Sequence, residues 1–161
     1  MYSLIIAGGK GERLRPLTDT TPKPMLRVAG KPIAYYQVQQ SIYAGITDVI
    51  FLSGYLSSVI EEYFGDGKNF GINITYSVEM SPLGRGGAIR KALSILPLSD
   101  EPVIVFNGDV YSDFGIVKLI DRYKSSQALN SNHAGTLLIH RYQSSYGIVE
   151  IDSKYDVTGF S

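Results

Sequence analysis

Apolar and polar positions along the chain repeat with two different periods. Four short runs predict strands, at residues 3–7, 48–53, 72–78 and 103–106. Residues 48–53 and 103–106 are apolar almost throughout, as in strands buried on both faces of a sheet, whereas apolar and polar residues alternate along 72–78. Each run is followed by a segment with apolar residues every three or four positions, which predicts a helix. This alternation predicts an α/β fold with a doubly wound, mostly parallel, Rossmann-like sheet and helices on both faces. Ligands of such sheets bind beyond the carboxyl ends of the strands.

Local signals mark the ends of the predicted helices. Pro32 suits the start of the first helix and Gly45 its end, because proline lacks an N–H group and glycine adopts the left-handed conformation readily. Ser58 and Glu61 have the spacing of a capping box for the second helix. Asp113 is expected to cap the fourth.

The pattern changes in the last third of the chain. Residues 127–132 are polar and predict a loop, and residues 135–140 and 146–151 predict two strands without a helix between them. A length of 161 residues is typical of one domain.

Composition excludes several classes of protein. Fifteen basic and fifteen acidic residues cancel, so no global field attracts nucleic acid or an anionic membrane. The absence of cysteine excludes disulfides and thiolate metal sites. No apolar run has the length of a membrane span and no signal-peptide pattern is visible, so we expect a cytoplasmic protein with no membrane partner.

The first strand leads directly into a glycine-rich turn beside several cations, Ala7-Gly8-Gly9-Lys10-Gly11-Glu12-Arg13. Glycine lets main-chain N–H groups approach a ligand, and the cations indicate a polyanion, which together predict a nucleotide site. The turn is not a dinucleotide fingerprint, because Leu14 occupies the position of its third glycine. It is not a Walker loop either, because Gly9-Lys10 is followed by Gly11 rather than by serine or threonine.

The stretch resembles the signature of the sugar nucleotidyltransferases (nucleoside-diphosphate-sugar pyrophosphorylases), Ala-Gly-Gly-x-Gly-(Thr or Glu)-Arg-Leu-x-Pro-Leu-Thr, followed by Pro-Lys-Pro. Every element is present, with Glu12 at the variable position. The resemblance implies a GT-A-like nucleotidyltransferase that joins a nucleoside triphosphate to a sugar 1-phosphate and releases pyrophosphate. It implies catalytic roles for Arg13, on the triphosphate, and for Lys23, against the reacting phosphates. The nucleotide would lie on Ala7, Gly8, Gly9 and Gly11.

Asp109 follows the apolar run 103–106 and a glycine. Packing explains a carboxylate poorly at this position, because an unpaired buried charge is costly. Carboxylate oxygen suits Mg²⁺ held between protein and phosphates. Beside the N-terminal signature, Asp109 resembles the family's metal aspartate, and a simple Gly-Asp turn is the alternative.

A second glycine-rich loop, residues 79–87, corresponds in the family to the segment over the base and ribose. Relatives that take uracil or thymine resemble one another in having glutamine near its start, where this chain has Glu79. A carboxylate only accepts hydrogen bonds and guanine offers two adjacent donors, so Glu79 favours GTP. The pattern around Gly84 also resembles the branch that acts on mannose 1-phosphate. One alternative is that Glu79 faces solvent and the base is bound by main chain alone. Another is a UTP- or dTTP-dependent enzyme.

The resemblance also covers the C-terminal part. Tyr146 and Gly147 resemble a segment that lines the family's sugar-phosphate pocket, and the chain ends just before the place of the Glu-Lys-Pro signature. We therefore expect residues 1–161 to be the nucleotide-binding part of the domain, without its C-terminal portion. An uncovered strand edge then favours a homo-oligomer.

Two other classes of function are compatible with parts of the pattern. A non-catalytic module that senses nucleotides or sugar nucleotides would share the fold, although it has no need of a cation for the reacting phosphates. A dinucleotide-dependent oxidoreductase is disfavoured by the failed fingerprint.

Overall fold

The computed structural model describes residues 1–97, 101–139 and 149–160. They form two compact units, Met1–Ile116 and Val117–Ser161, which are treated separately below. The expected single domain over residues 1–161 stays a prediction. No helix in the described ranges is long and apolar enough to cross a membrane.

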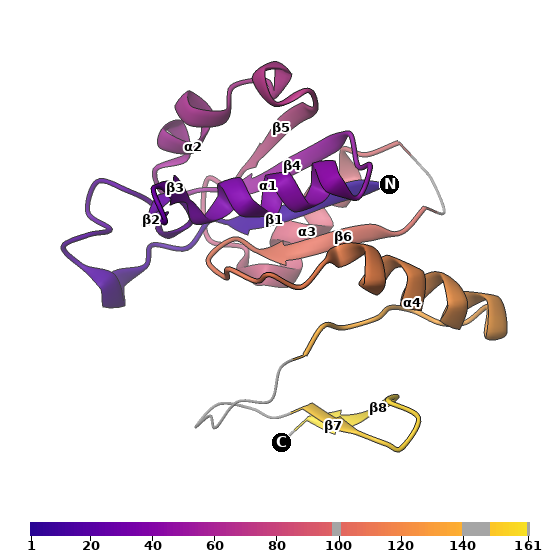
Figure 1. Ribbon diagram of the computed structural model, residues 1–161. Coiled ribbons are helices and arrows are strands. Elements are labelled where there is room, and N and C mark those ends of the chain that lie inside the picture. Colours follow the sequence, from indigo (N-terminus) through magenta and orange to yellow (C-terminus); the bar gives the residue numbers. More distant parts are fainter. Residues whose placement is uncertain (98–100, 140–148, 161) are drawn as a thin grey trace. The chain divides into compact units, whose positions relative to one another are not determined.

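The first unit is built on a four-stranded parallel sheet with the order β5-β4-β1-β6 (Figure 1). The strands are β1 (Tyr2–Ala7), β4 (Asp48–Ser53), β5 (Asn73–Val78) and β6 (Val103–Asn107). Each predicted apolar run is one of these strands, and the parallel sheet is confirmed. The first strand in the sequence lies inside the sheet, between β4 and β6.

Helices cover both faces of this sheet, as the alternation predicts. α1 (Ile33–Tyr43) and α2 (Ser57–Phe64) pack on the face that carries Ile5 and Phe51. α3 (Gly84–Ser94) packs through Ala88 and Ala92 on the opposite face, against Leu4 and Leu52. Neighbouring strand residues point to opposite faces, so one apolar run serves both helical layers.

Short elements connect this framework. They are the 3₁₀ helices η1 (Glu12–Leu14), η2 (Lys23–Met25) and η3 (Lys68–Phe70) and the antiparallel pair β2 (Arg27–Val28) and β3 (Lys31–Pro32). η1 and η2 lie between β1 and α1 in the sequence and carry the predicted Arg13 and Lys23.

The helix-end predictions were right for α1 and wrong for two others. Pro32 is the residue before α1, and Gly45 follows its last turn with a φ of 75°. α2 is preceded by Leu56 and has no side-chain cap, so the capping box of Ser58 is wrong. α4 (Ile116–Leu129) begins three residues after Asp113, which therefore does not cap it.

The second unit contains most of α4 and an antiparallel hairpin of β7 (Val149–Ile151) and β8 (Val157–Phe160). Residues 127–129 belong to α4, so the predicted loop begins later. Residues 135–139 form no strand, contrary to the prediction. The predicted strand 146–151 is seen as β7, and its first three residues lie outside the described ranges.

Candidate active site

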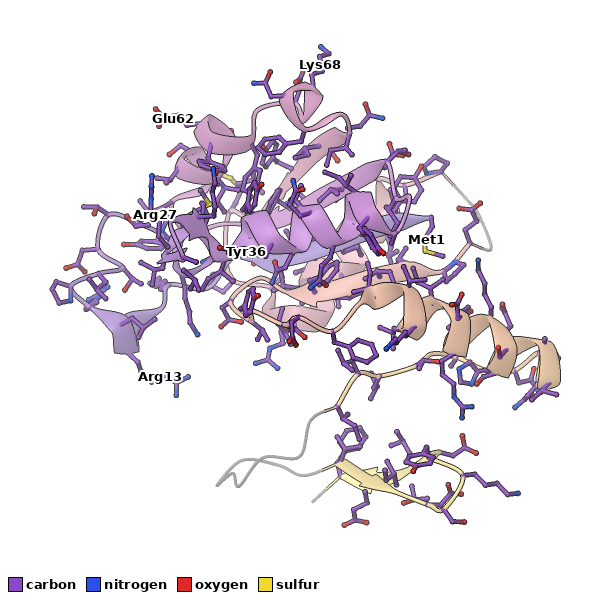
Figure 2. All side chains as sticks on the ribbon, in the orientation of Figure 1. Met1, Arg13, Arg27, Tyr36, Glu62 and Lys68 are labelled. Carbon is purple, nitrogen blue, oxygen red and sulfur yellow. The ribbon has the colours of Figure 1, made fainter. Side chains whose placement is uncertain are left out.

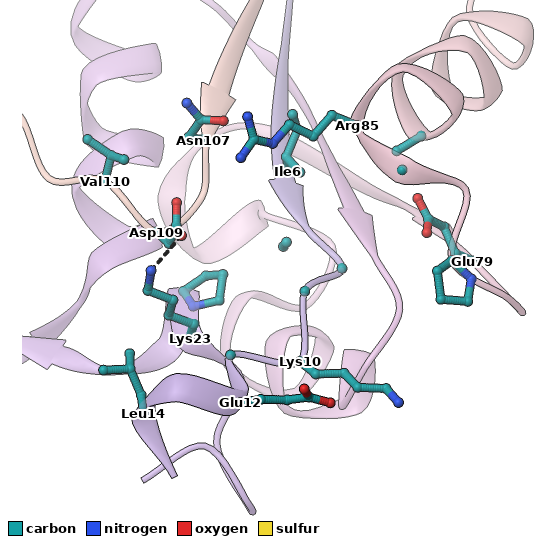
Figure 3. A pocket seen from close by; sticks show the side chains of 18 of the residues that line it. Ile6, Lys10, Glu12, Leu14, Lys23, Glu79, Arg85, Asn107, Asp109 and Val110 are labelled. Carbon is teal, nitrogen blue, oxygen red and sulfur yellow. Dashed lines mark hydrogen bonds and ion pairs between the residues drawn. The ribbon is translucent and has the colours of Figure 1, made fainter. Parts of the chain in front are cut away.

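A cavity of about 990 Å³ lies at the carboxyl ends of β1, β5 and β6 (Figure 3). All its lining residues belong to the first unit. Nine of the residues singled out in the sequence line it, namely Ala7, Gly8, Gly9, Gly11, Arg13, Lys23, Glu79, Gly84 and Asp109. Tyr146 and Gly147, the two predicted sugar-binding residues, lie outside the described ranges. The structure thus brings together the described candidates from four separate segments.

The glycine loop follows β1 and has its conformation fixed at Gly11. This residue has a φ of +63°, and a Cβ atom there would lie 3.0 Å from Cγ2 of Thr18 and 3.4 Å from Cβ of Lys23. The fully buried Thr18 donates a hydrogen bond of 2.9 Å from its hydroxyl to the Gly11 carbonyl oxygen. Glycine is needed at this position both for the left-handed backbone and for the close packing.

Replacing Thr18 with valine tests this support for the loop. Valine keeps the shape but cannot donate to Gly11, so we expect a loss of about 1 kcal/mol in unfolding free energy and weaker nucleotide binding. Urea unfolding and calorimetry measure the two effects. Thr75→Val, on the exposed side of β5, is the matched control and should change neither. Wild-type stability and affinity in Thr18→Val would show that the hydroxyl does not hold the loop.

Lys23 and Asp109 form an ion pair across the cavity, 86 residues apart in the sequence. The Lys23 Nζ atom lies 2.7 Å from Oδ2 of Asp109, and the side chains are 33% and 41% exposed. An ion pair this exposed contributes only about 0–1 kcal/mol. The Lys23 ammonium and the Asp109 carboxylate therefore neutralise each other in the free protein. A ligand that separates them loses little binding free energy in doing so.

Gly108 fixes the point where the chain leaves β6. Its N–H group donates to the Ile6 carbonyl oxygen at 2.9 Å, and a Cβ atom on Gly108 would lie only 2.2 Å from that oxygen. This contact holds the segment before Asp109 directly against β1.

Glu79 follows β5 and organises the second loop. Its N–H group donates to Ser53 of β4 at 2.8 Å, and its Oε2 atom accepts the N–H of Leu83, the residue before α3, at 3.1 Å. Within the described part of the chain, Oε1 accepts no hydrogen bond. A Cβ atom on Gly8 would lie 3.7 Å from Oε2, so the carboxylate stands beside the glycine loop.

Arg85 and Asn107 are among the cavity residues that were not singled out in the sequence. Arg85 extends from the first turn of α3 toward the side of the cavity that carries Asn107 (Figure 3). The place of Arg85 among the glycines of residues 84–87 was the available signal, since such loops precede phosphate-binding helix ends. Asn107, the last residue of β6, offered no signal, because in the sequence it is a single polar residue after the apolar run 103–106.

The arginines of the glycine loop have different surroundings. Arg13 stands on η1, at the outer end of the loop (Figure 2), and lines the cavity. Arg15 forms an ion pair of 3.3 Å with Asp19 and does not line the cavity. This difference separates a candidate ligand-binding cation from a structural one.

The cavity offers a metal ion few protein ligands. The described residues contain no group of three or more His, Asp or Glu side chains that could hold a metal ion. Asp109 presents carboxylate oxygens to the cavity, and a cation there would take its other oxygens from the ligand and water, as Mg²⁺ commonly does.

A glycine loop, a lysine and a carboxylate at the carboxyl edge of a parallel sheet occupy the place where open α/β folds bind their ligands. Residues 2–161 match the family described as nucleotidyl transferase. The chain belongs to this family, which confirms its resemblance to the sugar nucleotidyltransferases.

Two curated relatives and one solved structure illustrate the similarity. The chain is 38% identical over 152 residues to a mannose-1-phosphate guanyltransferase of Gibberella zeae, covering 92% of this chain and 40% of the relative. It is 45% identical over 114 residues to an N-acetylmuramate alpha-1-phosphate uridylyltransferase of Neisseria meningitidis, covering 70% and 48%. A putative glucose-1-phosphate thymidylyltransferase from Bacillus anthracis, in complex with a sucrose, superposes with a TM-score of 0.72 at 26% identity, covering 78% and 51%. The chain thus spans less than half the length of these two curated relatives.

Proposed function

We propose that this chain carries the nucleotide-binding half of a sugar-1-phosphate nucleotidyltransferase domain. The proposed reaction transfers a nucleotidyl group to mannose 1-phosphate or a similar sugar phosphate, and GTP is the favoured donor. The observation that carries the proposal is the meeting of the glycine loop, Lys23 and Asp109 in one cavity. An oxygen of the sugar phosphate attacks the α-phosphorus, the bond from that phosphorus to the bridging oxygen breaks, and pyrophosphate leaves with its electron pair.

Charge stabilisation is the main task of the residues around the phosphates. Negative charge grows on the leaving pyrophosphate, so fixed cations and N–H groups aimed at its oxygens lower the barrier. Arg13 and Lys23 are the cations in our proposal, and Gly8 to Gly11 supply main-chain donors. Mg²⁺ would neutralise further phosphate charge, and the exposed carboxylate of Asp109 fits it as an oxygen donor.

The Lys23–Asp109 ion pair gives the free site a defined resting state. With a magnesium nucleotide bound, Lys23 would pair with a phosphate and Asp109 would hold the cation, so each would exchange one opposite charge for another. The exchange costs little because the exposed pair stabilises the free protein by no more than about 1 kcal/mol.

Glu79 is the residue that selects the base in this proposal. With Oε2 on Leu83, its Oε1 atom remains to accept a hydrogen bond from guanine. The relative at 45% identity is named as a uridylyltransferase, which makes UTP the second candidate.

Replacing Glu79 with glutamine should shift the preference from GTP toward UTP or dTTP. A carboxamide can donate to a pyrimidine carbonyl and also accept from N3–H, whereas the carboxylate only accepts. Calorimetric ranking of GTP, UTP and dTTP with Mg²⁺ measures the shift. Glu12→Gln, which removes a charge from another residue of the cavity, is the control and should keep the wild-type ranking. An unchanged ranking in Glu79→Gln would remove the base-selecting role.

Two assays test the proposed reaction. Calorimetry with GTP, UTP, dTTP, CTP and ATP, each with Mg²⁺, measures binding, and pyrophosphate release with mannose 1-phosphate measures turnover. Binding with turnover supports the enzyme, and binding without turnover in a chain extended to the length of its relatives supports the nucleotide-sensing alternative. Absence of binding to every nucleotide in a folded sample contradicts both.

The remaining expectations concern the whole protein. Within the described residues β6 has a strand on one side only, and its Val105 is 42% exposed, which supports self-association. A homo-oligomer and a cytoplasmic location stay predictions.

A further inference from the structure

Gln37 of α1 makes two hydrogen bonds to the segment that carries Asp109. Its Nε2 atom donates to the Asn107 carbonyl oxygen at 2.7 Å and to the Val110 carbonyl oxygen at 2.9 Å. These two carbonyls flank Gly108 and Asp109, so one amide group spans the turn that presents the carboxylate. Gln37 is 4% exposed and does not line the cavity.

The same segment is held at further points. One turn along α1, the Gln40 Nε2 atom donates to the Ser112 carbonyl oxygen at 2.5 Å. The rings of Tyr36 and Tyr111 meet edge to face with centroids 5.0 Å apart. Since Gly108 is also bonded to β1, the turn lies between a helix and a strand that both belong to the core.

Packing alone does not account for Gln37. It lies on the same face of α1 as the buried Ala34 and Val38, a position where an apolar residue would suit the core. Its Oε1 atom is buried and has no hydrogen-bond partner among the described residues, which costs free energy that an apolar side chain would avoid. The feature that only the amide supplies here is the pair of N–H donors to residues 107 and 110.

We propose that Gln37 is a positioning residue, which acts through Asp109 by fixing the turn from which its carboxylate enters the cavity. The inference rests on the proposed function, in which Asp109 holds the cation beside the triphosphate. Groups that orient a metal ligand without touching the metal commonly change metal affinity or activity by roughly 10–100-fold when they are removed.

The test compares Gln37→Met with Gln39→Met. Methionine has a similar length and no donor, and the side chain of Gln39, on the same helix, makes no hydrogen bond with the described residues. In the nucleotide-free protein we expect amide hydrogen exchange in residues 107–112 to become faster in Gln37→Met and to stay unchanged in Gln39→Met. This readout requires neither metal nor nucleotide.

Titration with GTP, in Mg²⁺ and in EDTA, gives the second readout. We expect Gln37→Met to weaken binding in Mg²⁺ by roughly 10-fold or more and to leave binding in EDTA unchanged. In an Asp109→Asn background the same substitution should have no further effect on the Mg²⁺ dependence. If Gln37→Met does not fold, Gln37→Asn keeps an amide that is one methylene shorter and should show the same changes at smaller size.

The outcomes separate the two proposals. Wild-type exchange and wild-type Mg²⁺ dependence in Gln37→Met overturn the positioning role, as does an equal further loss in the Asp109→Asn background. Failure of the wild-type protein to bind GTP with Mg²⁺ would instead contradict the proposed function. In that case faster exchange in Gln37→Met would still show that the amide holds the turn.

Discussion

Gly108→Ala is expected to lower the unfolding free energy by about 3 kcal/mol, at the upper end of the usual cost of overpacking. The added Cβ would lie 2.2 Å from the Ile6 carbonyl oxygen, and neither atom can rotate away, because the oxygen belongs to the backbone and the backbone fixes the position of Cβ. Relief requires β1 and the turn after β6 to separate, which also moves Asp109. We therefore expect weaker Mg²⁺-dependent nucleotide binding in the fraction of protein that folds.

Urea unfolding and calorimetry measure both consequences of Gly108→Ala. Gly86→Ala is the matched control, because a Cβ there has open space in α3 and should stabilise the helix by up to about 1 kcal/mol. Equal stabilities of the two variants would show that β1 and the turn do not approach as closely as this structure has them.

Asp109→Asn is expected to remove most of the Mg²⁺ dependence of triphosphate binding and to leave the fold intact. Removing residues behind a metal ligand costs roughly 10–100-fold, so loss of the ligand itself should cost about 100-fold in Mg²⁺. Without Mg²⁺, we do not expect the substitution to weaken triphosphate binding. Lys23 is then released from its ion pair, so the triphosphate should bind as tightly as in the wild type or up to about fivefold more tightly, given the small free energy of an exposed pair.

Titration with GTP in Mg²⁺ and in EDTA measures both arms of this prediction. Asp66→Asn serves as the control, because Asp66 also forms a close ion pair with a lysine, Lys68 at 2.6 Å, and does not line the cavity. Unchanged Mg²⁺ dependence in Asp109→Asn would take Asp109 out of the metal site. Weaker binding in EDTA would contradict the resting ion pair.

The sheet was predictable because its strands are recognisable one at a time. β4 was predicted to the residue, since an apolar run between polar ends is buried whatever its partners are. The C-terminal third was predicted only in part, since α4 and β7 were expected but one strand was not found. Residues 135–139 have strand-like composition but form no strand, because pairing depends on partners and not on composition alone.

The candidate site was also predictable only in part. The motif residues could be assigned to one edge of the sheet, because parallel strands place their carboxyl ends together. The contact between Lys23 and Asp109 was not predictable from residues so distant in the sequence. Gln37 left a weak signal, a polar residue inside the apolar stripe of Ala34 and Val38, which the helical pattern alone gave no reason to interpret.

The central position of β1 has a consequence for synthesis of the chain. This strand is made before both of its neighbours in the sheet, residues 48–53 and 103–107. Pairings between distant segments form slowly, so β1 lacks one of its neighbours until residues 103–107 have been made and is open to chaperones until then. The glycine loop is made early, but the cavity is complete only when Asp109 has been made. We therefore expect nucleotide binding to begin only when the first unit is nearly complete.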